Sequence, residues 1–129
     1  MRGDNTAKAA PVPIFAEEIR GPIDLQHLSR QTLGDSALEL EILRLFDEMS
    51  HVYYDRVETS TTVEDLQRNL HTLKGAASGI GAFALAELAR VAETELRQGL
   101  PVNPERIDDL NIAVQEVSAF IADRLKSAA

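Results

Sequence analysis

The chain of 129 residues is long enough for one domain with a single core, and its 13 basic and 21 acidic side chains give a net charge of −8. This balance argues against general binding to nucleic acids or anionic membranes, and the absence of cysteine excludes disulfides, thiolate catalysis and cysteine–zinc sites. No apolar run approaches the ~20 residues that cross a bilayer, and the start lacks an apolar signal core, so we expect a cytoplasmic protein.

The beginning of the chain predicts an arm followed by a short helix. Residues 1–13 are small and polar with two prolines, which indicates a flexible arm and leaves residues 14–129 as a single domain. Asp24 is suited to the N-cap of a short helix over residues 25–33, and Gly34 is suited to end it.

A long amphipathic helix is expected next, from Asp35 or Ser36 to about Glu58. Ser36 and Glu39 have the spacing of a capping box. Apolar residues recur every three or four positions, and this periodicity predicts the face that the helix buries. That face consists of Leu38, Ile42, Leu45, Met49 and Val52, widened by Phe46 and Tyr53.

The third helix contains the most informative stretch of the sequence. Thr61 and Glu64 have capping spacing at its start, and Gly81 ends it. The same three-and-four periodicity predicts a buried stripe along it. The stripe consists of Leu66, Leu70, Leu73, Ala77 and Ile80.

Two further helices complete the pattern. One follows Gly81 at once, and the last begins after a break, with Asn103 as its N-cap and Pro104 at its first position. Four long helices joined by short loops, with no strand pattern, predict an all-α fold. We expect an antiparallel up-down-up-down four-helix bundle with a short additional N-terminal helix. The inward residues of the last two helices are Leu85, Leu88, Ala89, Ala92 and Leu96, then Ile107, Leu110, Val114, Val117, Ile121 and Leu125.

His71 is predicted to point away from the core of this bundle. It follows the buried Leu70 by one position, which turns it by about 100° around the helix. Lys74 and Gly75 lie one turn further on, on the same flank. A glycine inside a helix costs about 0.8–1.0 kcal/mol relative to alanine. Gly75 therefore indicates that another molecule approaches the helix closely beside His71.

The motif around His71 resembles the signature of histidine-containing phosphotransfer (HPt) domains, which is His-x-x-Lys-Gly followed six residues later by a second glycine. Here these residues are His71, Lys74, Gly75 and Gly81, and with the flanking helices the resemblance covers about residues 23–126. The resemblance implies that His71 accepts a phosphoryl group from an aspartyl phosphate on one receiver domain and donates it to an aspartate on another.

The chemistry of this motif rests on the imidazole ring. A neutral ring nitrogen can attack a phosphoryl group in line, and Lys74 can offset the charge of the phosphoryl oxygens. The family usually supplies a partner for the other ring nitrogen twenty-two residues later, which here is Glu93. Arg90 and Arg97 lie one turn either side of Glu93 and could hold its carboxylate. Alternatively, Glu93 forms an exposed ion pair worth well under ~1 kcal/mol.

We expect a partner to cover the surface around His71, with Arg68 and Lys74 complementing the acidic, Mg²⁺-holding phosphorylation pocket that the resemblance implies for a receiver domain. His27 and His51 have neither an adjacent glycine nor a lysine three residues on, and are predicted to be ordinary surface or boundary residues. The spacing of the three histidines predicts no metal site. The His71 strip comprises Gln67, Arg68, His71, Lys74, Gly75 and Ser78, and Gln31 of the short helix is expected to contribute beside it.

Three functions fit these observations. The first is a phosphorelay intermediate that serves the receiver domains of response regulators or hybrid histidine kinases. The second is the phospho-accepting domain of a larger sensor or chemotaxis-type kinase, and the third is a helical adaptor without phosphate chemistry. The chain contains nothing that resembles an ATP-binding kinase domain, so we expect a phosphocarrier rather than an enzyme. We also expect no cofactor of its own and, as the family default, a monomer.

Overall fold

The computed structural model of the protein describes residues 21–128, and the arm predicted for residues 1–13 lies outside them. Within the described residues all regular structure is helical, which confirms the predicted all-α fold. No helix in this part of the chain has both the length and the apolar character that crossing a bilayer requires. The helices are α2 (Leu25–Gln31), α3 (Ser36–Thr59), α4 (Val63–Ile80), α5 (Phe83–Arg97) and α6 (Pro104–Ala128).

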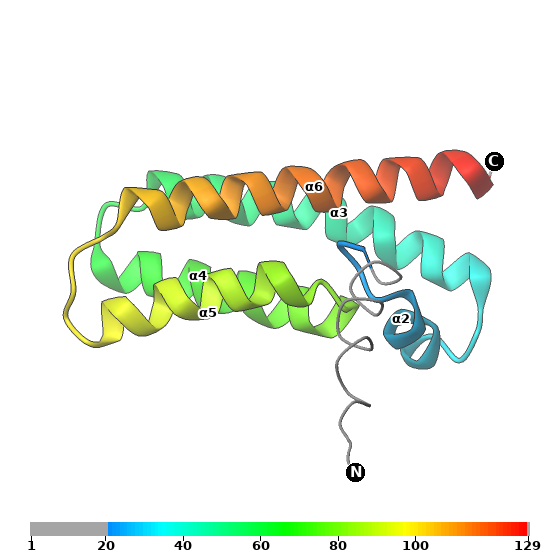
Figure 1. Ribbon diagram of the computed structural model, residues 1–129, viewed down its shortest axis with the longest axis horizontal. Helices are drawn as coiled ribbons and strands as arrows, with labels where there is room; N and C mark the ends of the chain where they lie inside the picture. Colours follow the sequence, from blue (N-terminus) through cyan, green and yellow to red (C-terminus); the bar gives the residue numbers. More distant parts are fainter. Residues whose placement is uncertain (1–20, 129) are drawn as a thin grey trace, which may run out of the picture.

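The four long helices form an antiparallel bundle (Figure 1). Each of α3 and α5 packs against both α4 and α6, so successive helices are neighbours around the bundle. The starting turns of α3 project beyond the turn that joins α4 to α5, and α2 lies beside them (Figure 1). Because α2 contacts both α3 and α4, it covers one side of this end of the bundle.

The N-caps of α2, α3 and α4 follow one geometric rule, although two of them differ from the prediction by one residue. Asp24 caps α2 as predicted, but Asp35 rather than Ser36 caps α3, and Thr62 rather than Thr61 caps α4. An N-cap residue keeps an extended backbone while its side chain accepts a hydrogen bond from a backbone N–H two or three residues further on. Asp35 and Thr62 have that backbone and make that bond, so the adjacent Ser36 and Thr61 do not act as the caps.

Helix α2 is two residues shorter than predicted because the chain changes direction at Thr32. The Thr32 hydroxyl donates to the carbonyl of Leu28 at 3.0 Å, and Thr32 itself is buried. Leu33 then has a φ of +54°, a left-handed conformation that no helix continues. Its side chain points into solvent, 94 % exposed. Gly34 follows with a positive φ, as a glycine after a helix end does.

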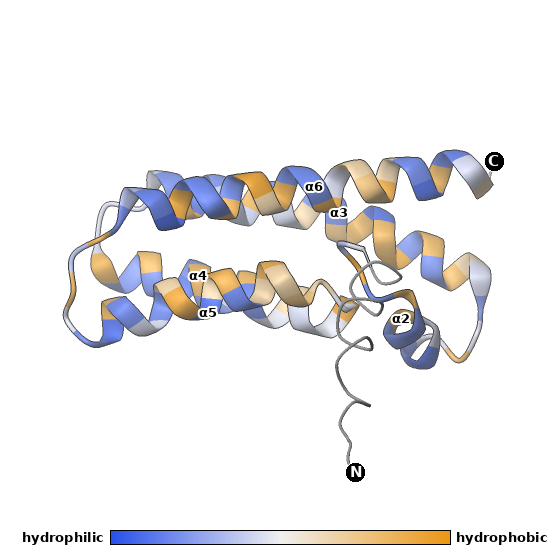
Figure 2. Cartoon of the chain, in the orientation of Figure 1, coloured by the Kyte–Doolittle hydropathy of each residue, from blue (hydrophilic) through white to orange (hydrophobic). Residues whose placement is uncertain are grey.

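The core agrees with the predicted stripes of α4, α5 and α6 in nearly every position. All five predicted residues of α4 are buried, and so are Leu110, Val114, Val117 and Ile121 of α6. Leu88 of α5, and Ile107 and Leu125 of α6, are half-buried. Figure 2 shows the pattern behind this agreement, since hydrophobic segments recur along each helix with hydrophilic segments between them. Burying these side chains against one another supplies most of the driving force for the fold.

The predicted core face of α3 is partly wrong. Phe46 is buried, and Ile42, Met49 and Tyr53 are half-buried against the core, but the other three predicted residues are not. Leu38, Leu45 and Val52 are 44 %, 55 % and 46 % exposed, so roughly half of each side chain remains in water. Helix α3 carries apolar residues on two faces, and periodicity alone does not say which face meets the other helices. The face that meets α4 and α6 consists of Leu43, Phe46, Ser50, Tyr54 and Val57.

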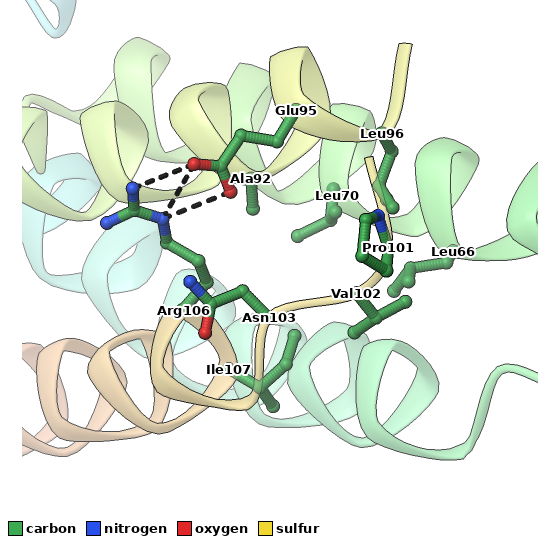
Figure 3. Close-up of a pocket in the computed structure, with 10 residues that line it drawn as sticks. All are labelled: Leu66, Leu70, Ala92, Glu95, Leu96, Pro101, Val102, Asn103, Arg106 and Ile107. Atoms are coloured by element: carbon green, nitrogen blue, oxygen red, sulfur yellow. Dashed lines mark hydrogen bonds and ion pairs between the residues drawn. The ribbon is translucent and has the colours of Figure 1, made fainter. Parts of the chain in front are cut away.

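The end of the bundle far from α2 is closed by the loop between α5 and α6. Pro101 and Val102 fold over apolar side chains of α4 and α5, and Arg106 binds the carboxylate of Glu95 through two nitrogens, as Figure 3 shows. The space left among these residues is about 10 Å³, which holds one water at most. This end is therefore a packed structural junction without room for a ligand.

Candidate functional site

His71 lies in the middle of α4, on the side that faces solvent. Its side chain is 63 % exposed, while Leu70 and Leu73 on the opposite side of the helix are fully buried. Helix α4 packs against α3 on one side and against α5 on the other. The bundle therefore holds the backbone of His71 rigidly and leaves its ring open to another molecule.

A carboxylate of α5 lies beside the ring. Glu93 Oε2 is 3.1 Å from His71 Nδ1, and the Glu93 side chain is only 3 % exposed. Small residues allow this approach, because Ala89 and Ala92 are the buried positions of α5 immediately before Glu93. The structure thus brings Glu93 into contact with His71, and the alternative of an exposed ion pair is wrong because the carboxylate is buried.

Two cations also contact the Glu93 carboxylate. Lys74 Nζ lies 2.9 Å from Oε1, and Arg97 donates a hydrogen bond to Oε2, the oxygen that also binds His71. Arg90, which was expected to hold this carboxylate together with Arg97, binds Glu87 instead, through two hydrogen bonds. Glu87 is one turn before Arg90 on the exposed side of α5, so the guanidinium meets a partner there and does not reach Glu93.

The charge state of Glu93 follows from these contacts. Burial alone would raise the pKa of Glu93, but Lys74, then His71 and Arg97, outweigh burial and lower that pKa below its usual value. The carboxylate is therefore ionised at neutral pH and can only accept hydrogen bonds. The proton between Glu93 and His71 must then be on Nδ1, which leaves the lone pair of a neutral ring on Nε2.

The other residues of the His71 strip share the outer face of α4. Arg68 and Ser78 are exposed, Gln67 is half-buried, and Arg68 forms a 2.7 Å ion pair with Asp65. Apart from the backbone of its own helix and its chain neighbours, no atom lies within 4 Å of the position that a Cβ on Gly75 would take. The packing of the protein itself therefore does not require glycine at this position, in contrast to the tight contacts that Gly81 makes with Asp24 at the end of α4.

Two hollows adjoin the strip, one that includes part of it and extends to α5, and one toward α2 and α3. The first, here called the polar hollow, measures about 450 Å³ and contains His71 itself. The second, here called the apolar groove, measures about 300 Å³ and lies between α2, α3 and α4. The polar hollow is lined by Glu64, Gln67, Arg68, His71, Thr72, Glu93 and Arg97, and the apolar groove by Leu28, Gln31, Ile42, Leu45, Phe46, Met49, Ala76, Gly79 and Ile80.

The apolar groove was missed in the sequence because its α3 side was assigned to the core. Ile42, Leu45 and Met49 belong to the second apolar face of α3, and Gln31, expected to contribute beside the strip, also lines the groove. A helix with two apolar faces is itself a signal of an external contact, since only one face is needed for the core.

The remaining two histidines join helices to one another. His27 Nε2 lies 3.0 Å from the carbonyl of Gly79 and attaches α2 to the last turn of α4. His51 Nε2 lies 3.1 Å from the hydroxyl of Ser118 and connects α3 with α6. Both rings therefore have structural partners, and neither shares the open surroundings of His71.

Comparison with known families identifies a match. A family model described as "Hpt domain" matches residues 41–120, a stretch that runs from α3 into α6 and includes His71, Lys74 and Glu93. No curated protein and no solved structure matches the chain at the significance required.

Proposed function

Because the chain belongs to the Hpt domain family, whose members are phosphotransfer modules of two-component signalling, we propose that it is a phosphorelay intermediate. In this proposal His71 takes a phosphoryl group from the aspartyl phosphate of one receiver domain and passes it to the aspartate of another. The chain acts as a phosphocarrier, so the phosphoryl group originates on another protein. The observation that supports this most is the bond between His71 Nδ1 and the ionised Glu93, which leaves the lone pair on Nε2 of a side chain that is 63 % exposed.

The transfer step needs a nucleophile with a fixed orientation. The lone pair of Nε2 attacks the phosphorus of the aspartyl phosphate, the P–N bond forms as the P–O bond breaks, and the aspartate leaves as a carboxylate. The ring gains positive charge in this step, which the Glu93 carboxylate stabilises through the Nδ1–H bond. Lys74 brings a positive charge beside the incoming phosphoryl oxygens. Transfer to the next receiver reverses the same changes.

The receiver domain is proposed to dock over the His71 strip and the apolar groove together. Gly75 leaves space through which the partner's aspartate reaches Nε2. Leu45 and its neighbours in the groove offer apolar surface that the protein itself leaves exposed, which is typical of a protein–protein contact. The receiver's acidic, Mg²⁺-containing pocket would meet Arg68 and Lys74, although the whole chain has a net charge of −8.

Incubation with a phosphorylated receiver domain tests this function directly. We expect phosphate to move to the chain and to form a bond that is labile in acid and stable in base, as a phosphoramidate is. A panel of receiver domains, each mixed with the labelled protein, then identifies those that accept the group fastest. If no receiver in the panel donates or accepts phosphate, the relay function is wrong and a helical adaptor becomes the better description.

A further inference from the structure

We propose that Arg97 is a second phosphoryl-binding residue, whose guanidinium binds the oxygens of the phosphoryl group carried on Nε2 of His71. This inference rests on the proposed function, because it concerns the phosphorylated form of the same site. It assigns a direct contact to an arginine of α5 that the unphosphorylated protein holds on Glu93.

The charges of the site leave a cation available for an anion. One carboxylate, that of Glu93, is in contact with two cationic side chains, Lys74 and Arg97, so these three groups sum to one positive charge. This excess lies in a chain whose net charge is −8. A protein-bound phosphoryl group brings about two negative charges at neutral pH. Without a phosphoryl group the cluster therefore carries an excess of positive charge. One of its two cations can move to the phosphoryl group while the other stays paired with Glu93.

Arg97 is better placed for this movement than Lys74. The Lys74 side chain is only 25 % exposed, is held on Glu93 Oε1, and does not line the polar hollow. The Arg97 side chain is 59 % exposed and lines the polar hollow together with His71. Its guanidinium has five N–H donors and uses one nitrogen on Glu93, so other donors are free for phosphoryl oxygens.

The shared oxygen makes Arg97 and His71 neighbours. Arg97 and His71 Nδ1 both bond to Glu93 Oε2, so the guanidinium lies beside the ring that carries the phosphoryl group. Arg68, the other arginine of the polar hollow, is engaged by Asp65 at 2.7 Å. When the P–N bond forms, Arg97 donates N–H bonds to phosphoryl oxygens, and it returns to Glu93 when the phosphoryl group leaves. No proton moves in this exchange.

A ³¹P NMR titration of the phosphorylated protein tests the contact. A neighbouring cation favours the dianionic phosphoryl group, so Arg97→Ala should move the midpoint of the phosphorus titration upward by roughly half a pH unit. The variant should also hold roughly threefold to tenfold less phosphate at equilibrium with a phosphorylated receiver, about the value of one ordinary hydrogen bond, because the site is exposed. Arg90→Ala is the matched control, because Arg90 lies on the same helix and binds Glu87, away from the site.

A Glu93→Gln background separates direct binding from an effect that acts through Glu93. If Arg97 binds the phosphoryl group, Arg97→Ala still raises the titration midpoint in this background. If Arg97 only orients the carboxylate, the Arg97→Ala change adds nothing there, and the inference is overturned. A titration of Arg97→Ala identical to that of Arg90→Ala also overturns it while leaving His71 as the acceptor. If neither a receiver nor a small phosphodonor labels the wild-type protein, the proposed function and this inference are both wrong.

Discussion

Glu93 is an ionised carboxylate in a buried position, and its stability depends on the groups around it. An ion removed from water loses hydration worth several kcal/mol unless other charges and hydrogen bonds replace it. Here Lys74, His71 and Arg97 provide that replacement, and together they lower the pKa of Glu93 despite its burial. The same contacts determine which nitrogen of His71 faces solvent. One side chain therefore connects the stability of the α4–α5 contact with the chemistry of the site.

Glu93→Ala should change the tautomer balance of His71 and weaken the fold. Without the ionised acceptor, Nδ1 no longer holds the proton in preference to Nε2, so the two ring nitrogen shifts move toward each other in ¹⁵N NMR spectra. Lys74 also loses its counter-ion, and we expect a loss of about 1–2 kcal/mol in the free energy of unfolding. Nitrogen shifts equal to those of the wild-type protein would mean that Glu93 does not reach His71 in solution.

Lys74→Ala should slow phosphoryl transfer more than it harms the fold. The lysine charge is predicted to stabilise phosphoryl oxygens in the transition state, and because its side chain is a quarter exposed the effect should be roughly tenfold, below that of a buried oxyanion donor. Rapid mixing with a phosphorylated receiver measures the transfer rate, and thermal unfolding measures the stability. A transfer rate equal to the wild-type rate would limit Lys74 to a structural role on Glu93.

At the scale of single elements, α4 combines a buried stripe with an open outer face. Its two motif glycines have different physical reasons. Gly81 ends the helix at a φ of +95°, and a Cβ there would lie 3.0 Å from the carbonyl of Asp24. Gly75 has ordinary helical geometry and open space above it. The fold requires glycine at position 81. At position 75, only a partner that approaches α4 closely gives a reason for glycine.

Gly75→Gln should therefore stabilise the fold and, in the same variant, block phosphoryl exchange with receiver domains. Removing a glycine from inside a helix should add about 0.5–1 kcal/mol to the free energy of unfolding. The longer side chain fills the space that the partner's aspartate needs, so exchange with receiver domains should stop, while a small phosphodonor still labels His71. Gly75→Ala is the graded control and should retain most of the transfer. Wild-type exchange by Gly75→Gln would mean that the docking surface lies elsewhere.

Helix α3 serves two surfaces, since one apolar face meets the core and the other lines the apolar groove. Leu45→Asn should weaken receiver binding by roughly tenfold, the effect expected of one apolar anchor in an interface. Because Leu45 is half exposed, the change should cost little stability. Ile112→Asn is the matched control, as Ile112 is exposed to the same degree on α6. Isothermal titration with a receiver domain measures both, and equal affinities would remove the groove from the interface.

Local sequence patterns predicted the helices and their buried faces well where a helix has a single apolar face. Every long helix, the buried stripe of α4 and the outward direction of His71 follow from periodicity. The sequence misled on α3 because two apolar faces compete, and the choice depends on contacts with distant helices. It could not predict the burial of Glu93 either, since that depends on how closely the alanines of α5 let it approach α4. The cap errors of one residue reflect adjacent Asp, Ser and Thr residues that can each accept the same bond.

For the whole molecule, the bundle acts as a rigid support for the exposed ring of His71. The core lies behind α4, the buried carboxylate lies on the α5 side of His71, and the apolar groove lies on the α3 side. The far end is packed shut by the loop that Arg106 attaches to Glu95. Among the described residues, the features that would recognise a receiver domain therefore gather on one face, around His71.

The most direct test of the central claim compares His71→Gln with the wild-type protein in a transfer assay from a phosphorylated receiver. Because His71 is exposed, we expect the variant to melt within a few degrees of the wild-type protein. It should acquire no acid-labile phosphate, whereas the wild-type protein acquires it and passes it to a second receiver. Acid-labile label on His71→Gln at the wild-type level would contradict the assignment of His71 as the phosphoryl acceptor.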